Sequence, residues 1–298
     1  MTAPTNNKSL IIEEYPVPPF NQQTQPIPGL ASKMEPRPDH GETSYRGSGK
    51  LTGRKALITG GDSGIGRAVA IAYAREGADV AINYLPEEEA DAVEVVQLIE
   101  AEGRKAVAIP GDIRSESFCN KLVHQAAEQL GGLDILVNNA GRQQFNKSIR
   151  TLSTEDFDAT FKTNVYAMFW ITKAALEYLP AGSSIINTSS VQAYKPSEIL
   201  LDYAQTKAAI VAFTKSLAKQ LGKEKIRVNA VAPGPYWTAL QVSGGQPQEK
   251  VQHFGEDAPL GRPGQPAEIA SLYVTFAQLD NSFTSGQVWC SDGGTGTL

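Results

Sequence analysis

The segment that decides the fold reads Thr59-Gly60-Gly61-Asp62-Ser63-Gly64-Ile65-Gly66. It follows a short apolar run at 55–59 (KALIT), which predicts a β-strand, and precedes a stretch at 67–76 that predicts an α-helix. A glycine turn placed between a first strand and a first helix is typical of sites that bind the phosphates of a dinucleotide.

The glycines of this turn have separate physical roles. Gly60 can adopt backbone angles that other residues avoid, Gly64 lets the chain approach a pyrophosphate, and Gly66 lets the helix pack closely on the sheet. The N-terminus of the helix then offers free N–H groups and the positive end of its dipole to the phosphates. Many glycine clusters are only turns. The interpretation as a phosphate-binding turn therefore depends on the position of this cluster between the first strand and the first helix.

Strand and helix patterns alternate to the end of the chain. The expected strands are 55–59, 78–84, 105–109, 134–138, 184–188, 227–232 and 287–290, and the expected helices are 67–76, 87–102, 118–130, 154–178, 202–221 and 266–277. The strands are short and nearly all apolar, as strands covered by helices on both faces are. The sequence therefore predicts an α/β fold with a single doubly wound, Rossmann-like parallel sheet of about seven strands flanked by helices. We predict one domain over 50–298, with a lid at about 236–262.

Residues 1–49 have a different composition. Eight of the 18 prolines fall in the first 38 residues, and each fixes φ and removes a backbone donor. We predict an extended arm; the alternative is a disordered linker. Because Tyr15, Val17 and Phe20 are apolar groups that a solvated tail does not need, we expect the arm to clamp a neighbouring subunit and to take no part in the chemistry.

Composition excludes several classes of function. The 298 residues carry a net charge of −5, which argues against a nucleic-acid partner. The cysteines, Cys119 and Cys290, stand far apart and the three histidines are scattered, so we predict no disulfide framework and no metal site. There is no signal-peptide pattern and no run of roughly 20 apolar residues, so we expect a cytoplasmic protein without a membrane partner.

The end of the second expected strand leaves the choice between NAD and NADP open. An acidic residue there would bind the ribose 2′-hydroxyl and a basic one would accommodate a 2′-phosphate, but Tyr84 and Leu85 are neither. The acidic run 87–89 comes later and is interpreted as favourable charge at the start of the next helix. Asp62 and Ser63 carry no positive charge either, so we expect weak discrimination.

A tyrosine and a lysine lie four residues apart in the segment Tyr203-Ala-Gln-Thr-Lys207, which begins a strongly helical stretch. This spacing places both side chains on one face of the helix. An ammonium group favours the phenolate, and the phenol can then act as base in alcohol oxidation and acid in carbonyl reduction. Ser190 follows an apolar strand at the sheet edge where α/β sites form, and its hydroxyl can bind the substrate oxygen.

At this point the chain resembles the short-chain dehydrogenase/reductase family. The matching motifs run in chain order: the turn 59–66; Asp112 with Ile113; Asn138-Asn139-Ala140-Gly141; Asn164; Ser190, Tyr203 and Lys207; Pro233-Gly234, then Tyr236 and Thr238. The resemblance implies that Tyr203 is the general acid/base, that Lys207 lowers its pKa and holds the nicotinamide ribose, and that Ser190 orients the substrate. It further implies that Asn164 positions a water in a proton relay to Lys207.

The resemblance also implies which residues contact the NAD or NADP cofactor. They are Gly60, Asp62, Ser63, Gly64, Ile65, Gly66, Tyr84, Leu85, Asp112, Ile113, Asn139, Ala140, Gly141, Tyr203, Lys207, Pro233, Gly234, Tyr236 and Thr238.

Further features concern the subgroup and the substrate. The arm and the run Pro38-Asp39-His40-Gly41-Glu42 resemble a bacterial subgroup related to glucose and ribitol dehydrogenases, and the family implies a homotetramer with helices 156–178 and 203–221 at one interface. Tyr236 and Trp237 stand where many members carry an aliphatic and an acidic residue, so we expect both aromatics to narrow the substrate pocket; the alternative is that they only pack against the protein. Gln192 is expected to line that pocket as well.

The sequence thus predicts an NAD(P)-dependent oxidoreductase that transfers a hydride between the nicotinamide and an alcohol or carbonyl substrate. One alternative is a catalytically silent cofactor-binding or scaffold protein on the same fold, although the tyrosine and lysine whose loss would mark it are both present. Another is a nucleotide-sugar epimerase, which uses the same triad but usually has a larger C-terminal substrate region.

Overall fold

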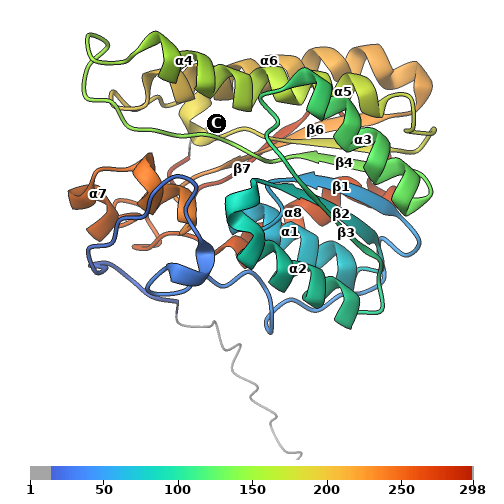
Figure 1. The fold of residues 1–298 in the computed structure, drawn as a ribbon, viewed down its shortest axis with the longest axis horizontal. Coiled ribbons are helices and arrows are strands. Elements are labelled where there is room, and N and C mark those ends of the chain that lie inside the picture. The colour runs from blue at the N-terminus through green and yellow to red at the C-terminus, as the bar shows by residue number, and fades with distance from the viewer. Residues whose placement is uncertain (1–14, 297–298) are drawn as a thin grey trace, which may run out of the picture.

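The architecture is a seven-stranded parallel sheet between two layers of helices (Figure 1). The structure is a computed structural model that describes residues 15–296. The strand order is β3-β2-β1-β4-β5-β6-β7, so the chain starts in the middle of the sheet and winds outward in both directions. This confirms the predicted doubly wound fold. The order reverses between β1 and β4, and at such a point the carboxyl ends of the strands leave a crevice.

The elements agree with the predicted segments in kind and order. The strands are β1 (Lys55–Thr59), β2 (Asp79–Tyr84), β3 (Ala106–Pro110), β4 (Ile135–Asn138), β5 (Ser184–Thr188), β6 (Arg227–Pro233) and β7 (Val288–Ser291). The α-helices are α1 (Gly64–Arg75), α2 (Glu89–Ala101), α3 (Glu116–Leu130), α4 (Thr154–Phe161), α5 (Ala167–Ala175), α6 (Leu201–Leu221), α7 (Gln248–Gln252) and α8 (Pro266–Ala277). Short helical turns are η1 (Ala31–Lys33), η2 (Pro86–Glu88), η3 (Lys162–Tyr166), η4 (Val191–Ala193), η5 (Gly222–Glu224), η6 (Gln241–Gly245) and η7 (Leu279–Asn281).

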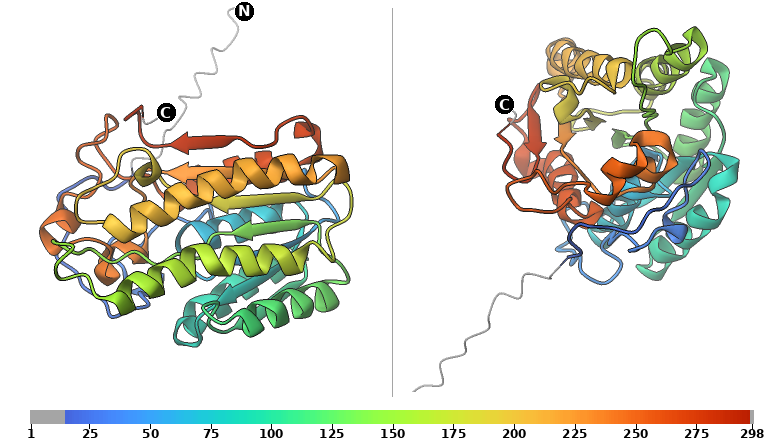
Figure 2. Two further views of the ribbon diagram at one scale, coloured as in Figure 1. Left: turned by 90° about the horizontal axis from the view of Figure 1, so that it is seen from above. Right: turned by 90° about the vertical axis from the view of Figure 1, so that its left-hand side faces the viewer.

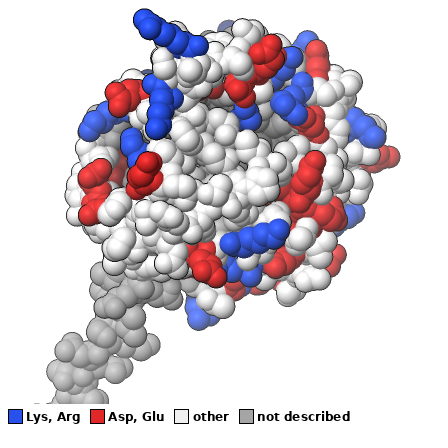
Figure 3. All heavy atoms as spheres, turned by 60° about the vertical axis from the view of Figure 1, so that its left-hand side comes forward, with Lys and Arg blue, Asp and Glu red and all other residues white. Residues whose placement is uncertain are grey.

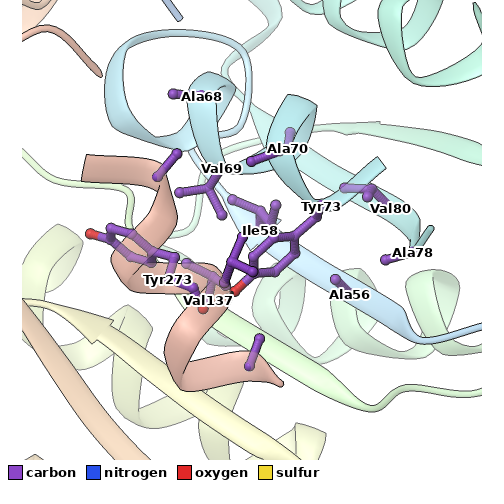
Figure 4. Close-up of a cluster of buried hydrophobic side chains, with 14 of the residues drawn as sticks. Ala56, Ile58, Ala68, Val69, Ala70, Tyr73, Ala78, Val80, Val137 and Tyr273 are labelled. Carbon is purple, nitrogen blue, oxygen red and sulfur yellow. Dashed lines mark hydrogen bonds between the residues drawn. The ribbon is translucent and has the colours of Figure 1, made fainter. Parts of the chain in front are cut away.

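Two cores hold the layers together because successive strand residues point to opposite faces of the sheet. Ile58 of β1 packs with α1, α2 and α8, in a cluster that includes Tyr73 and Tyr273 (Figure 4). Its neighbour Leu57 packs on the other face with residues of α3, α5 and α6, such as Leu122. Each fully buried aliphatic side chain contributes roughly 1.5–3 kcal/mol. The nearly continuous apolar strands predicted from the sequence are therefore buried on both sides.

Helix α1 begins one turn earlier than the expected start at residue 67, and includes two of the motif's glycines. Glycine is a poor helix former, so helix propensity alone predicts that the helix begins at residue 67, three residues after its actual start at Gly64. Close packing decides the outcome: a Cβ on Gly66 would lie 1.8 Å from the carbonyl oxygen of Gly60. The predicted role of Gly66 in close packing is thus seen directly in the contact.

The expected continuous helix at 154–178 is wrong in one respect. The π-helical turn η3 separates α4 from α5, and α5 ends at Ala175. A π-turn inserts one residue into a single turn, and so small a shift of the apolar pattern does not show in the periodicity. Asn164 lies inside this turn and is buried. The expected lid also contains helical turns that the sequence did not indicate, η6 and α7.

The described part of the N-terminal arm, residues 15–49, packs against the segment at 236–262 of its own chain, where the sequence predicts a lid, as the right-hand view of Figure 2 shows. The N–H of Phe20 donates to the carbonyl of Gln252 at 2.8 Å, and that of Gln25 donates to the carbonyl of Val242 at 3.0 Å. The ring of Phe20 stacks on Trp237 with centroids 4.2 Å apart. The expectation that Phe20 is covered by a neighbouring subunit is therefore wrong. Residues 1–14 lie outside the described part.

The segment at 38–42 fastens the arm to the domain. Glu42 accepts a hydrogen bond from the buried guanidinium of Arg67, in α1, at 3.1 Å. The backbone N–H of Asp39 donates to Gln265, and its carbonyl accepts from Ala267 at the start of α8, both at 3.0 Å. This segment, which marked a subgroup in the sequence, therefore acts as an anchor for the arm.

On the face drawn in Figure 3, basic and acidic side chains are interspersed. Among residues 15–296, no helix has both the length and the apolar character that crossing a membrane requires.

Replacing Phe20 with alanine should loosen the arm. A buried Phe→Ala change costs about 3–5 kcal/mol in a core, and less where the surroundings can collapse, so the arm should open at least 10-fold more often. The measurement is the rate of trypsin cleavage after the exposed Lys33. Val17→Ala is the control, because Val17 is exposed. Equal cleavage rates in both variants would show that Phe20 does not hold the arm.

Candidate active site

A cavity of about 430 Å³ lies at the carboxyl ends of the strands, where the strand order reverses. Its size falls in the range of small-molecule and cofactor sites. Of the residues expected to contact cofactor or substrate, all line this cavity except Gly66, Asn164 and Trp237. The fold therefore brings together in one crevice groups that are spread from residue 60 to residue 238.

Two loops form the floor of the cavity at the reversal point. The side chain of Asn139, after β4, donates to the carbonyls of Thr59 and Gly60 at 3.2 and 3.1 Å. The hydroxyl of Thr59 accepts from the N–H of Ala140 at 3.1 Å. The run 138–141 therefore holds the glycine turn in place, which explains why both motifs occur together.

Tyr203, Lys207 and Ser190 meet at the other end of the cavity. The first two stand one turn apart near the start of α6, and the ammonium of Lys207 lies 5.3 Å from the centre of the Tyr203 ring. It donates to the carbonyl of Thr188 at 2.9 Å. The hydroxyl of Ser190 accepts from the N–H of Gln192 at 3.1 Å. The strand end fixes the serine, and the helix fixes the tyrosine and lysine.

Burial sets the proton affinities of this group. It raises the pKa of Tyr203 to about 12, although a hydrogen bond with Ser190 acts in the opposite direction. It lowers the pKa of Lys207 to about 7. The expected effect of the lysine charge on the tyrosine is therefore outweighed by desolvation in the protein alone.

Asn164 occupies a different position from the other three. Its side-chain oxygen accepts from the N–H of Arg142 at 2.7 Å, and its nitrogen donates to the carbonyl of Arg142 and to Thr206 at 2.9 and 3.0 Å. It lines a second, small cavity of about 10 Å³, next to the carbonyl-bearing end of β5 at Thr188. Such a volume is close to the minimum for one water molecule.

Trp237 corrects one expectation. Its side chain is fully buried between the arm and the lid, and its Nε1 donates to the carbonyl of Pro36 at 2.8 Å. It stacks on Phe20 instead of narrowing the pocket. The arm supplies the wall that the sequence did not indicate, since Ile27, Pro28 and Gly29 line the cavity. No periodicity or motif marks these three residues.

Several other residues that line the cavity are not marked by any motif in the sequence. Glu88 and Arg114 border the end of the cavity near β2 and β3, and the amide side chains of Gln143 and Gln144 border the lid. Gln143 donates to the carbonyl of Gly245 at 2.8 Å. The acidic run 87–89 was a visible signal, but it was attributed to the helix terminus alone.

Comparisons with known proteins agree with this geometry. The family model described as enoyl-(acyl carrier protein) reductase matches residues 60–296. The chain belongs to the short-chain dehydrogenase/reductase family. It is an NAD(P)-dependent oxidoreductase.

Individual relatives cover nearly the whole chain. The oxidoreductase YhxD of Bacillus subtilis (strain 168) is 60% identical over 93% of this chain and 94% of its own. Glucose and ribitol dehydrogenase of Daucus carota is 43% identical over 93% and 96%. A short-chain dehydrogenase from Burkholderia cenocepacia J2315, solved in complex with NADP, matches with a TM-score of 0.77 and 36% identity over 82% of this chain and 98% of its own.

Lys207→Met should stabilise the cofactor-free protein at neutral and acidic pH. The unfolded chain keeps the ordinary lysine pKa of 10.5, whereas the folded pKa is about 7. The unfolded state therefore binds more protons between pH 7 and 10.5, and the native protein gains stability as pH rises through this interval. Each tenfold loss of proton affinity on folding costs about 1.4 kcal/mol, so removing the ammonium recovers stability, partly offset by the lost hydrogen bond to Thr188.

The measurement is the Tm of both proteins between pH 6 and 10.5. The variant should melt several degrees higher at pH 6, and the difference should shrink as pH rises. Lys215→Met is the control, because this lysine is exposed on the same helix. A wild-type Tm that exceeds the variant's at pH 6 would contradict the argument.

Proposed function

We propose that the chain transfers a hydride between the nicotinamide of NAD(P) and an alcohol or carbonyl substrate, with Tyr203 as the general acid/base. The observation that carries the proposal is the placement of Tyr203, Lys207 and Ser190 in the cavity that the glycine turn also lines. An oxidised cofactor whose phosphates that turn would hold, and an alcohol whose oxygen Ser190 would hold, would share one enclosed space. Proximity of this kind lowers the barrier by fixing the reacting groups.

The residues present fit a dinucleotide. Gly60 has φ +61°, and a Cβ there would lie 3.0 Å from the Cα of Ala140, so the turn leaves no room for side chains where a phosphate must approach. The N-terminus of α1 follows directly. When bound, the cofactor supplies the hydride acceptor or donor, and its oxidised ring brings a positive charge beside Tyr203. That charge favours the phenolate against the effect of burial.

The proton has a path that the chain itself provides. In oxidation, the phenolate oxygen of Tyr203 would take the proton of the substrate hydroxyl as the hydride leaves the substrate carbon for the nicotinamide, while Ser190 donates a hydrogen bond to the substrate oxygen. Lys207, with a pKa of about 7, can exchange a proton near neutrality. The small cavity beside Asn164 supports the predicted water relay to Lys207, since it has space for about one water.

The substrate site combines polar and apolar walls. Gln192 and Gln246 bring amides, whereas Leu200 and Phe254 bring apolar surface. A compound that has hydroxyl groups besides the reacting one could use both kinds of wall. The similarity to a glucose and ribitol dehydrogenase makes sugars and polyols the first compounds to test, followed by small aldehydes and ketones.

We further propose a homotetramer. Two separate groups of large apolar side chains are exposed on the protomer: Tyr166 and Phe169 at the start of α5, and Leu279, Phe283 and Trp289 around β7. Two self-complementary interfaces are what a tetramer with dihedral symmetry needs. Light scattering at micromolar concentration measures the mass. A monomer would contradict this part of the proposal.

Tyr203→Phe should remove most turnover and leave cofactor binding nearly intact. The change deletes the transferable proton and keeps the ring, so kcat should fall by about 100-fold or more. The measurements are steady-state kinetics on a substrate found in the screen and titration of the reduced cofactor by fluorescence. Tyr178→Phe is the matched control, since the Tyr178 hydroxyl bonds to His124 outside the cavity.

The same experiment separates the alternative of a silent cofactor-binding protein. A wild-type chain that binds the reduced cofactor but turns over no compound of the screen would favour that alternative. A Tyr203→Phe variant with near-native kcat would show that another group handles the proton.

A further inference from the structure

Two carboxylates meet at the end of the cavity that lies next to β2. Glu88 belongs to η2, and Asp62 belongs to the glycine turn; both line the cavity. Glu88 folds back over the end of β2, because its Oε2 accepts from the N–H of Leu85 at 2.8 Å. Its carboxylate thus lies beside the strand end although Glu88 is four residues beyond Tyr84, the last residue of β2.

Asp62 has an incomplete set of hydrogen bonds. The residue is 1% exposed, and its Oδ2 has no hydrogen-bond partner within the part of the chain that the structure describes. A buried carboxylate oxygen without a donor is costly. Because Asp62 lines the cavity, a hydroxyl group of a bound molecule can supply the missing donor.

The surroundings of this pair are acidic. Burial raises the pKa of Asp62 to about 7, and burial together with the charge of Asp62 raises that of Glu88 to about 8. The buried Asp91 adds further negative charge, and its carboxylate accepts from the N–H of Ala31 in the arm at 2.6 Å. Negative charge is therefore already unfavourable here before any ligand adds more.

The nearby cations are already paired. Arg114 lines the cavity but makes bidentate hydrogen bonds with Asp112, at 2.8 and 2.6 Å to one carboxylate oxygen. Arg67 does not line the cavity and is ion-paired with Glu42 and Glu94 at 3.0 Å through Nη2, although its buried Nη1 has no hydrogen-bond partner within residues 15–296. Among residues 15–296, the other lining cations are Arg142, which pairs with Asp156, and Lys207 at the catalytic end. No unpaired arginine or lysine of that range faces the two carboxylates.

We propose that Glu88 and Asp62 bind the adenosine ribose of NAD(H) and exclude the 2′-phosphate of NADP(H). The carboxylates accept hydrogen bonds from the ribose hydroxyls, and one of those hydroxyls completes the hydrogen bonding of Asp62. A 2′-phosphate in the same place would lie against both carboxylates, and no unpaired cation of the described residues is nearby to offset the repulsion between the negative charges. The inference rests on the proposed function, since it assumes that a dinucleotide occupies the cavity.

This assignment replaces the expectation of weak discrimination. That expectation rests on the absence of charge at Tyr84 and Leu85, where an acidic residue would ordinarily bind the ribose, and it assigns the acidic run 87–89 to the start of the next helix. Here the acidic groups come from a later turn and from the glycine turn, and the backbone hydrogen bond of Leu85 brings Glu88 back to the strand end.

The test is a titration of the full chain with NADH and with NADPH at pH 9, where both carboxylates are charged because the pH lies above their pKa values of about 7 and about 8, followed by nicotinamide fluorescence. Like charges placed together repel, so the wild type should bind NADH on the order of 100-fold more tightly than NADPH. Glu88→Gln keeps an acceptor for the N–H of Leu85 and removes the charge. It should reduce the preference for NADH at least 10-fold, through weaker NADH and tighter NADPH binding.

Two further variants sharpen the result. Glu87→Gln, an exposed neighbour in the same turn, should leave both dissociation constants unchanged. Asp62→Asn should act in the same direction as Glu88→Gln, and circular dichroism checks that it folds. A merely structural role of Glu88 would weaken both cofactors equally and leave their ratio unchanged.

Three results would overturn the assignment. One is a wild type that binds both cofactors equally, and another is an unchanged ratio in Glu88→Gln. The third is tight NADPH binding that Arg114→Ala selectively weakens, which would place the phosphate against Arg114. Failure to bind either cofactor is a separate result: it would overturn the proposed function itself, and this assignment with it.

Discussion

The close approach of two loops is the constraint on which the rest of the structure depends. The turn after β1 and the loop after β4 leave the sheet side by side, and a Cβ on Gly60 would meet the backbone of Ala140 at 3.0 Å. Asn139 locks this approach by donating to the carbonyls of Thr59 and Gly60. With the two loops held together in this way, the N-terminus of α1 and the ends of β5 and β6 all line the same cavity. The site is therefore a consequence of how tightly two backbones can pack.

The chemistry of the crevice depends on charge held out of water. Burial raises the pKa of Tyr203 and lowers that of Lys207. In the cofactor-free protein, both side chains are therefore costly to ionise. The buried Lys207 lowers the free energy of unfolding of the protein. Such a cost is common in active sites, where a catalytic group needs an unusual pKa. At the opposite end, Asp62 and Glu88 are subject to the same effect. One cavity thus has a buried tyrosine and lysine at one end and two buried carboxyl groups at the other.

The arm joins parts of the molecule that the sheet does not connect. Its residues pack on the lid through Phe20 and Trp237, line the cavity at 27–29, and reach α2 where Asp91 accepts from Ala31. Proline lowers the entropy that such an extended segment loses on ordering. The apolar side chain of Phe20 is therefore buried by contacts within the same chain.

The sequence by itself determined the parallel sheet, the order of its elements, the glycine turn and the identity of the Ser190, Tyr203 and Lys207 group. These follow from local patterns, namely apolar periodicity, glycine position and a one-turn spacing, which need no knowledge of distant contacts. Tertiary structure decided the π-turn that buries Asn164, the burial of Trp237 under the arm, and the return of Glu88 to the end of β2. Each of these depends on groups far apart in the chain or on a single backbone hydrogen bond. A periodic pattern carries no record of either, because it reports which face of an element is buried but not what lies against it.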